Sequence, residues 1–312
     1  MTLVPVTYKG GIYQHDIVID LIEDLGGYIV QKHIIAADVV LQCFVPREDI
    51  ELIRQISKPL FGEVTDSPLV GTEIAVVSMS LEIHHLPHPS CDIAEYVRRN
   101  GAKSNMVSLA RGPGKRIAGL NDEERDVINE HDIAVYLMGN FETCIEYKMP
   151  TLRRGIEVPI VLCGGPAIEV LRKIIDPPVE GYVGNVGRFM RRTKEADQLD
   201  KLDEIVAEVT RVLEEKRDSI AKDPLSVSPA RLMGLINEKV PEILDVTSPT
   251  PLTVQMAGLR VKLPYDTFAE KMRKIEIEDG ITLGDVAEVL PSRMRDYILV
   301  KILPFSETNT VV

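Results

Sequence analysis

The chain has 312 residues, of which 45% are hydrophobic and 27% are charged, and its formal net charge is −12 at pH 7. This length and apolar content predict an ordinary globular protein of two domains, and the acidic balance argues against a broad nucleic-acid surface. The start, MTLVPVTYKGG, lacks a signal-peptide pattern and no run of about 18 apolar residues occurs, so we expect a cytoplasmic protein with neither membrane nor nucleic acid as a partner.

The first 70 residues combine helix and strand patterns. HDIVIDLIEDLGG (15–27) predicts a helix ended by Gly26 and Gly27, DVVLQCFV (38–45) predicts a strand, and PREDIELIRQISK (46–58) predicts a helix begun by Pro46. The sequence leaves open whether these elements extend a larger sheet or form a small subdomain of their own.

From about residue 72, strand patterns alternate with amphipathic helical ones. The strands are 72–80, 104–111, 132–139 and 158–163; the helices between them cover 91–101, 121–130 and 141–155, and Asn121 and Glu124 are spaced as a capping box. This alternation predicts an α/β fold, a doubly wound, Rossmann-like, mostly parallel sheet.

An unusual stretch follows each of these strands. HHLPHPSCD (84–92), GPGKR (112–116), NFETC (140–144) and GGP (164–166) come after the four strands in turn. Because ligands bind outside the carboxyl ends of the strands in an open parallel sheet, we expect the four turns to face one cleft.

The candidate metal ligands are Cys91, Cys144, Cys163 and His88. All four cysteines and all six histidines of the chain precede residue 164. With Ser90 as the N-cap, Cys91 would take the first helical position, where the helix dipole favours a thiolate. Thiolate and imidazole suit iron, iron-sulphur clusters and zinc, but free cysteines are more often apolar filling, which is how we interpret Cys43.

The loop around GPGKR is a candidate anion cradle. Backbone N–H groups at Gly112 and Gly114, with the cations of Arg111, Lys115 and Arg116, suit a phosphate, a carboxylate or an anionic cluster, and Gly164 and Gly165 complete the predicted cofactor-binding set. The alternative is a solvated basic turn. The loop is not a Walker A motif, because an arginine follows Lys115 and the glycine spacing differs.

The second half predicts a smaller α+β domain. Residues 195–222 form a long charged helix with an apolar seam that Lys216 interrupts; it either packs on its own domain's core or serves as a docking arm. A helix from Pro229, a hairpin turning at Ala257 and Gly258, a helix from Tyr265 and a strand at 296–303 follow. We therefore divide the chain into a cofactor-binding α/β domain, 1–190, and an interaction domain, 191–312.

Two segments, HHLPHPSCDIAEYVRRNGAKSNMVSLARGPGKRIAGL (84–120) and EHDIAVYLMGNFETCIEYK (130–148), resemble methanogenesis marker protein 7, a family of methanogenic archaea. The resemblance covers most of residues 1–190 and is weaker beyond. It implies a role in the ATP-dependent activation of methyl-coenzyme M reductase, in which an assembly of proteins reduces the nickel of coenzyme F430 to Ni(I).

The same resemblance implies a cofactor and partners. The cofactor is an iron-sulphur cluster, similar to a nitrogenase cofactor precursor and shared with partner chains. The partners are methyl-coenzyme M reductase and other activation or marker proteins, including an ATP-binding component, since this chain lacks a Walker A motif.

Three hypotheses follow. The first is an electron-transfer component of the activation assembly rather than a stand-alone enzyme. The second is an enzyme that holds an anionic metabolite in the Gly112–Arg116 loop, with His88 or His131 as acid or base. The third is a scaffold without a cofactor that works through the long helix and the acidic second domain.

Overall fold

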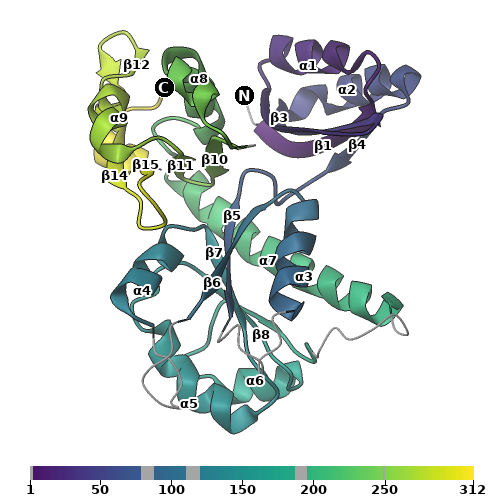
Figure 1. The fold of residues 1–312 in the computed structure, drawn as a ribbon, viewed down its shortest axis with the longest axis vertical. Helices are drawn as coiled ribbons and strands as arrows, with labels where there is room; N and C mark the ends of the chain where they lie inside the picture. The colour runs from purple at the N-terminus through teal and green to yellow at the C-terminus, as the bar shows by residue number, and fades with distance from the viewer. Residues whose placement is uncertain (1–2, 79–87, 110–119, 187–194, 249) are drawn as a thin grey trace.

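Three main sheets, each with its own helices, make up the fold in the computed structural model (Figure 1), which describes residues 3–78, 88–109, 120–186, 195–248 and 250–312. The first sheet belongs to an amino-terminal domain. Its elements are β1 (Leu3–Gly11), α1 (His15–Asp24), β2 (Tyr28–Ile35), β3 (Asp38–Pro46), the 3-10 turn Arg47–Asp49, α2 (Ile50–Ser57), the 3-10 turn Lys58–Leu60 and β4 (Glu63–Asp66).

These strands pair antiparallel in the order β2-β3-β1-β4, the arrangement of a ferredoxin-like βαββαβ unit. Alternate strand residues such as Val6, Tyr8 and Leu41 pack with Val18 and Ile22 of α1 in one apolar cluster. Of the two possibilities left open by the sequence, the separate subdomain is confirmed.

The second sheet is parallel throughout, as predicted. Its strands are β5 (Glu73–Ser78), β6 (Lys103–Ser108), β7 (Ile133–Leu137), β8 (Ile160–Cys163) and β9 (Gly181–Val183), in the order β6-β5-β7-β8-β9. Helices α4 (Asp122–Asn129), α5 (Glu142–Arg153) and α6 (Ile168–Ile174) pack on one face, and α3 (His88–Arg99) and α7 (Glu195–Lys222) on the other. The doubly wound fold and the capping box of Asn121 and Glu124 are confirmed.

The long helix α7 covers the parallel sheet. Its residues Ile205, Val209 and Leu213 are buried in one cluster with β5, β7 and β8. Lys216, which interrupts the apolar seam, donates from Nζ to the backbone oxygen of Asp132 over 2.9 Å. The helix therefore packs on a core, but the division predicted at residue 190 separates it from the sheet that it covers.

The third sheet forms the predicted α+β unit. Strands β10 (Leu252–Gln255), β11 (Gly258–Val261), β15 (Ile298–Ile302) and β14 (Ala287–Pro291) pair antiparallel in that order. The other elements are α8 (Pro229–Lys239), the 3-10 turn Pro241–Asp245, α9 (Tyr265–Arg273), the short pair β12 (Glu276–Glu278) and β13 (Ile281–Thr282), α10 (Leu283–Val286) and α11 (Phe305–Thr308). The hairpin turn is Met256–Ala257, one residue earlier than expected. None of the helices in the described ranges is long and apolar enough to cross a membrane.

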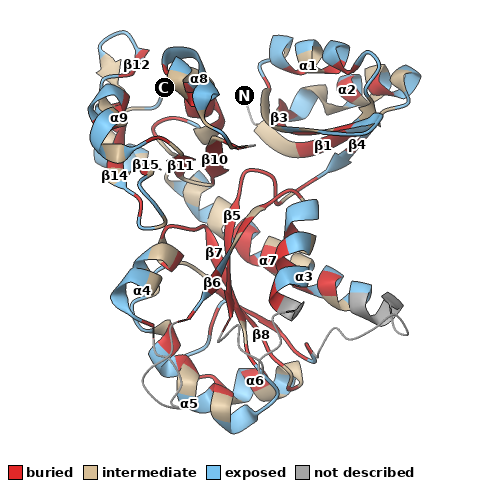
Figure 2. Ribbon diagram, in the orientation of Figure 1, coloured by how far each residue is buried: buried red, intermediate tan, exposed pale blue. Residues whose placement is uncertain are grey.

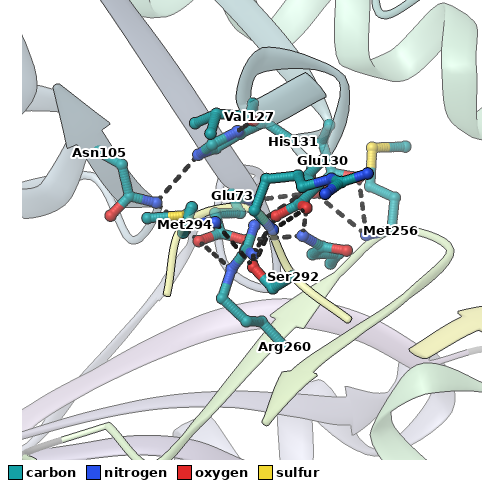
Figure 3. Close-up of polar contacts among 12 residues, drawn as sticks. Glu73, Asn105, Val127, Glu130, His131, Met256, Arg260, Ser292 and Met294 are labelled. Atoms are coloured by element: carbon teal, nitrogen blue, oxygen red, sulfur yellow. Dashed lines mark hydrogen bonds and ion pairs between the residues drawn. The ribbon is translucent and has the colours of Figure 1, made fainter. Parts of the chain in front are cut away.

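A buried polar network joins the third sheet to the amino edge of the parallel sheet (Figure 3). Arg260 of β11 is 1% exposed, and its Nη2 lies 3.1 Å from Oε2 of Glu73, the first residue of β5. Its Nη1 lies 2.6 Å from Oε2 of Glu130, which follows α4, and donates to Oγ of Ser292 over 2.5 Å. One guanidinium thus bridges two carboxylates of the parallel-sheet domain.

His131 completes the network. Its Nδ1 lies 2.8 Å from the backbone oxygen of Val127, and its Nε2 lies 3.0 Å from Nδ2 of Asn105, whose amide also donates to Glu73. The Val127 carbonyl oxygen can only accept, so it takes a proton from Nδ1 of His131. The Nδ2 amino group of Asn105 can only donate, so Nε2 of His131 accepts. These contacts fit a neutral ring with its proton on Nδ1. Burial lowers the pKa of His131, which agrees with that neutral form.

The ionisation of Glu73 depends on its partners. Burial alone would raise the pKa of this carboxyl, but the Arg260 guanidinium and the hydrogen bonds from Arg260 and Gln255 hold the pKa below its usual value. The carboxylate therefore contributes stability above about pH 4.5, and this contribution is lost as the pH falls through its depressed folded-state pKa.

We expect Arg260→Met to lower the free energy of unfolding by about 3–5 kcal/mol at neutral pH, because Glu73 is left buried without its counter-charge. Without Arg260, burial raises the pKa of Glu73, so the deficit should shrink as acidification protonates the carboxyl. Urea unfolding followed by far-UV circular dichroism at neutral and mildly acidic pH measures both effects.

Arg99→Met is the matched control, because Arg99 is 72% exposed and pairs with Glu95 on the surface of α3. Its cost should be about 0–1 kcal/mol. If both variants lose the same stability, or if the Arg260→Met deficit is independent of pH, the network does not hold the domains together.

Candidate functional site

The strand order defines where a ligand crevice can form. In chain order the parallel strands are arranged 2-1-3-4-5, and the connections that leave β5 and β7 turn to opposite faces, to α3 and α5. In sheets of this order the crevice lies outside the carboxyl ends of these neighbouring strands, at the topological switch point. This edge lies opposite the two other domains, which meet the amino edge (Figure 1).

The turn after β7 is packed against the turn after β8. The N–H of Gly165 donates to the backbone oxygen of Gly139 over 3.2 Å, and a Cβ on Gly165 would lie 2.0 Å from Oδ1 of Asn140. A side chain at this position would clash with Asn140, so glycine at 165 keeps the turns after β7 and β8 in contact. Gly164 donates its N–H to Val183 of β9. The cofactor-binding role of Gly164 and Gly165 stays a prediction.

Cys91 lies later in its helix than expected. Helix α3 begins at His88, so Cys91 is the fourth residue rather than the first, and Ser90 is not the N-cap. Proline is tolerated in the first helical turn, and Pro89 therefore does not stop the helix from starting earlier. Cys91 is exposed, and its Sγ lies 3.9 Å from Sδ of Met106, a 49% exposed residue of the edge strand β6.

Cys144 lies between two exposed aromatic side chains. It is the third residue of α5 and half-buried, and Phe141 and Tyr147, three residues to either side, are 77% and 85% exposed. Cys144 and Tyr147 are three apart and lie on one side of α5, and Phe141 is the extended N-cap residue just before the helix; we call the three a stripe. Exposed aromatic side chains are enriched at protein interfaces, which makes this stripe a candidate contact surface.

Cys163 has a different environment. It ends β8, it is fully buried among apolar residues on the face covered by α3 and α7, and burial raises its pKa. Burial likewise raises the pKa of Cys43 to about 12. Both environments favour thiols that fill the core.

The predicted metal and anion ligands lie partly outside the described residues. Over the described ranges, no group of three or more His, Cys, Asp or Glu side chains could hold a metal ion. The loop with Arg111, Gly112, Gly114, Lys115 and Arg116, together with His84 and His85, lies outside the described residues, as does the side chain of His88. The metal and anion sites at these residues stay predictions.

Sequence reasoning missed the exposed stripe. Phe141 and Tyr147 are aromatic residues at positions where the pattern NFETCIEYK places the solvent-facing side of a helix, which was the available signal. It also missed Met106, because nothing in the sequence pairs this residue with Cys91, 15 positions earlier.

We expect an aromatic disulfide reagent to modify Cys91 rapidly and Cys144 more slowly in the native protein, because these thiols are exposed and half-buried. Cys43 and Cys163 should react only after denaturation. Stopped-flow absorbance with Cys91→Ser and Cys144→Ser variants assigns each phase. A fast phase that persists in both variants would place a reactive thiol elsewhere.

Comparisons with known proteins give a family. A family model described as methyl-coenzyme M reductase operon protein C matches residues 3–275. An uncharacterized protein of Methanocaldococcus jannaschii is 43% identical over 304 residues, which cover 97% of this chain and 95% of that protein. Methyl-coenzyme M reductase I operon protein C of the same organism is 27% identical over 166 residues, 46% of this chain and 82% of that protein.

Solved structures add little. A formyltetrahydrofolate deformylase from Burkholderia mallei is 13% identical and covers 36% of this chain and 43% of its own, with a TM-score of 0.19. A likeness this low carries no argument about fold or function.

Proposed function

The chain belongs to the methyl-coenzyme M reductase operon protein C family, and we propose that it is an accessory redox protein of the ATP-dependent assembly that activates methyl-coenzyme M reductase. The observation that carries the link to this enzyme is the family match over residues 3–275, which spans the whole parallel sheet. The resemblance of residues 84–148 to methanogenesis marker protein 7 supplies the redox part of the proposal.

The proposed cofactor is an iron-sulphur metallocofactor at the switch point. Cys91 and Cys144 fit it, because each lies in the first turns of a helix that leaves one of the two strands at the switch point, and Cys91 is exposed and Cys144 half-buried. Cys163 does not fit, because its thiol is enclosed by apolar side chains. Such a cofactor would supply low-potential electrons.

A partner chain has to complete the ligand set. Iron-sulphur clusters are commonly held by four thiolates, and this chain offers two accessible ones in the described part. A cluster at a protein-protein contact needs a surface that excludes water around it. The Phe141–Cys144–Tyr147 stripe supports this arrangement, because it places a thiol between two aromatic contact residues.

The other hypotheses have less support. His131 is 4% exposed with both ring nitrogens in contact with Val127 and Asn105, so it is poorly placed as an acid or base for a metabolite. Helix α7 packs along the sheet and is not a free docking arm.

We expect Phe141→Ser combined with Tyr147→Ser to reduce the capture of methyl-coenzyme M reductase by about tenfold or more, because aromatic anchors dominate interface energies. Serine at position 141 suits the N-cap of α5, so the helix itself should persist. The measurement is an anaerobic pull-down from a methanogen expressing the tagged full chain, with captured reductase quantified against bait.

Phe61→Ser combined with Tyr13→Ser is the matched control, because these aromatics are 95% and 79% exposed on the amino-terminal domain. Their loss should leave capture unchanged. Equal loss in both double variants, or full capture by the Phe141/Tyr147 variant, would contradict the proposed surface.

We also expect Cys91→Ser combined with Cys144→Ser to abolish iron retention in the same anaerobic preparations, because the proposed thiolates are removed. Cys163→Ala is the control; it should keep iron, since Cys163 fills the core. Elemental analysis of iron and acid-labile sulphide measures the result, and thermal unfolding confirms that each variant is folded. Unchanged iron in the double variant would refute the ligand assignment.

A further inference from the structure

A polar niche lies where the three domains meet, away from the switch point. Its small cavity has a volume of about 20 Å³, which is enough for one water molecule or one oxygen atom of a ligand. Polar side chains from all three domains line it. They are Gln31 and Gln42 of the first sheet, Thr72 before β5 and Lys103 of β6, and Thr250 before β10 and Thr253 in it. The niche therefore exists only when the domains are assembled.

One buried hydroxyl in this niche has no partner. Thr253 is 5% exposed, and within the described residues its Oγ1 makes no hydrogen bond. Thr253 lines the niche, and it is paired in the sheet with Arg260, the residue that reaches the parallel-sheet domain. Buried hydroxyls are nearly always hydrogen-bonded, so the Oγ1 of Thr253 is suited to bond a group from outside the protein.

Two lysines beside the niche lack a carboxylate of their own. Lys262 donates from Nζ to Oγ of Ser248 over 2.8 Å and to Oγ1 of Thr250 over 3.2 Å. Neither Lys262 nor Lys103 forms an ion pair in the described part of the chain. Glu73 is the carboxylate that acts on both, and it is already held by Arg260.

The electrostatics agree with a surplus of positive charge. Burial lowers the pKa of Lys262 to about 8, and the charges of Lys103, Arg260 and Arg295 add to this effect while Glu73 opposes it. Burial also lowers the pKa of Lys103. An anion beside Lys262 would relieve the repulsion that Lys103, Arg260 and Arg295 exert on its ammonium group.

We propose that the niche binds a small dianion of the phosphate class, held by the ammonium groups of Lys103 and Lys262 and by the hydroxyls of Thr250 and Thr253. The cavity accommodates one oxygen of the anion, which accepts from the buried hydroxyl of Thr253. The remaining oxygens lie at the mouth, where the two half-buried lysines supply the balancing charge. This inference is independent of the proposed role in reductase activation.

Isothermal titration of the full-length protein with inorganic phosphate, at an ionic strength matched with chloride, tests the proposal. We expect saturable binding to one site, and Lys103→Gln and Lys262→Gln should each weaken it by about tenfold or more. Lys274→Gln is the matched control, because Lys274 is an exposed lysine at the end of α9. The site is refuted if no saturable binding occurs up to about 10 mM phosphate, or if the control weakens binding as much as the niche variants.

Thr253→Val keeps the shape of the side chain and removes the hydroxyl. If that hydroxyl binds the anion, the variant should weaken phosphate binding severalfold while its melting temperature without phosphate stays the same or rises, because an unpaired buried group is removed. Unchanged affinity in a folded Thr253→Val protein would overturn the assignment of this ligand.

The dependence on pH provides a second readout. Between about pH 8 and 9.5 phosphate is already a dianion, so the affinity should fall as Lys262 loses its proton through a pKa near 8. Glycerol 3-phosphate, titrated in parallel, distinguishes a free anion from the terminal group of a larger ligand. An affinity that is constant over this pH range would exclude Lys262 as a ligand.

Discussion

The arrangement of the domains depends on one buried guanidinium. Arg260 enters from the third sheet and pairs with Glu73 and Glu130 of the parallel-sheet domain, and all three side chains are less than a tenth exposed. Figure 2 shows β5 and β7 of that domain coloured as buried along nearly their whole length. Removing such charges from water is costly unless each is paired and hydrogen-bonded. Gln255, Asn105 and Ser292 complete the bonding of these carboxylates, so a displacement of the third sheet would leave a buried charge without its partner. The interaction therefore specifies one geometry, whatever its net contribution to stability.

The joint formed by Arg260, Glu73 and Glu130 lies at the amino edge of the parallel sheet and leaves the carboxyl edge for other contacts. Glu73 begins β5 and Asp132 precedes β7, so the two strands that flank the switch point are held at their opposite ends by the network. The switch point thus lies between two strands that are buried along nearly their whole length, whereas the helices that leave them begin near an exposed cysteine and exposed aromatic residues. Buried strands with exposed aromatic and sulphur-containing residues near their carboxyl ends suit a cofactor that is enclosed only when a partner docks.

The sequence predicted those features that depend on local patterns. Alternating strand and helix signals identified the doubly wound sheet, and the spacing of Asn121 and Glu124 identified a helix start, because their causes lie within a few residues. The joint could not be predicted, since Arg260 and Glu73 are separated by 187 positions and neither sits in a recognisable motif. The apolar seam of α7 predicted a buried face but not which sheet it covers. Cys91 was placed three residues too early in its helix because a proline at position 89 fits a first turn as well as it fits a preceding loop.

The polar network around Glu73 and the switch point lie at opposite ends of β5. Glu73 at the amino end of β5 and Ser78 at its carboxyl end are five positions apart, roughly 17 Å at the rise of an extended strand. An anion bound among Lys103, Lys262 and Thr253 would act at the amino end of β6, not on the thiol of Cys91, which lies beside Met106 farther along that strand. It would instead stabilise the contact among three domains by mass action, because the niche exists only when they are assembled. An anion in the niche would therefore favour the assembled arrangement of the domains, whereas the chemistry proposed at the carboxyl edge would depend on the groups around the switch point and on a docked partner.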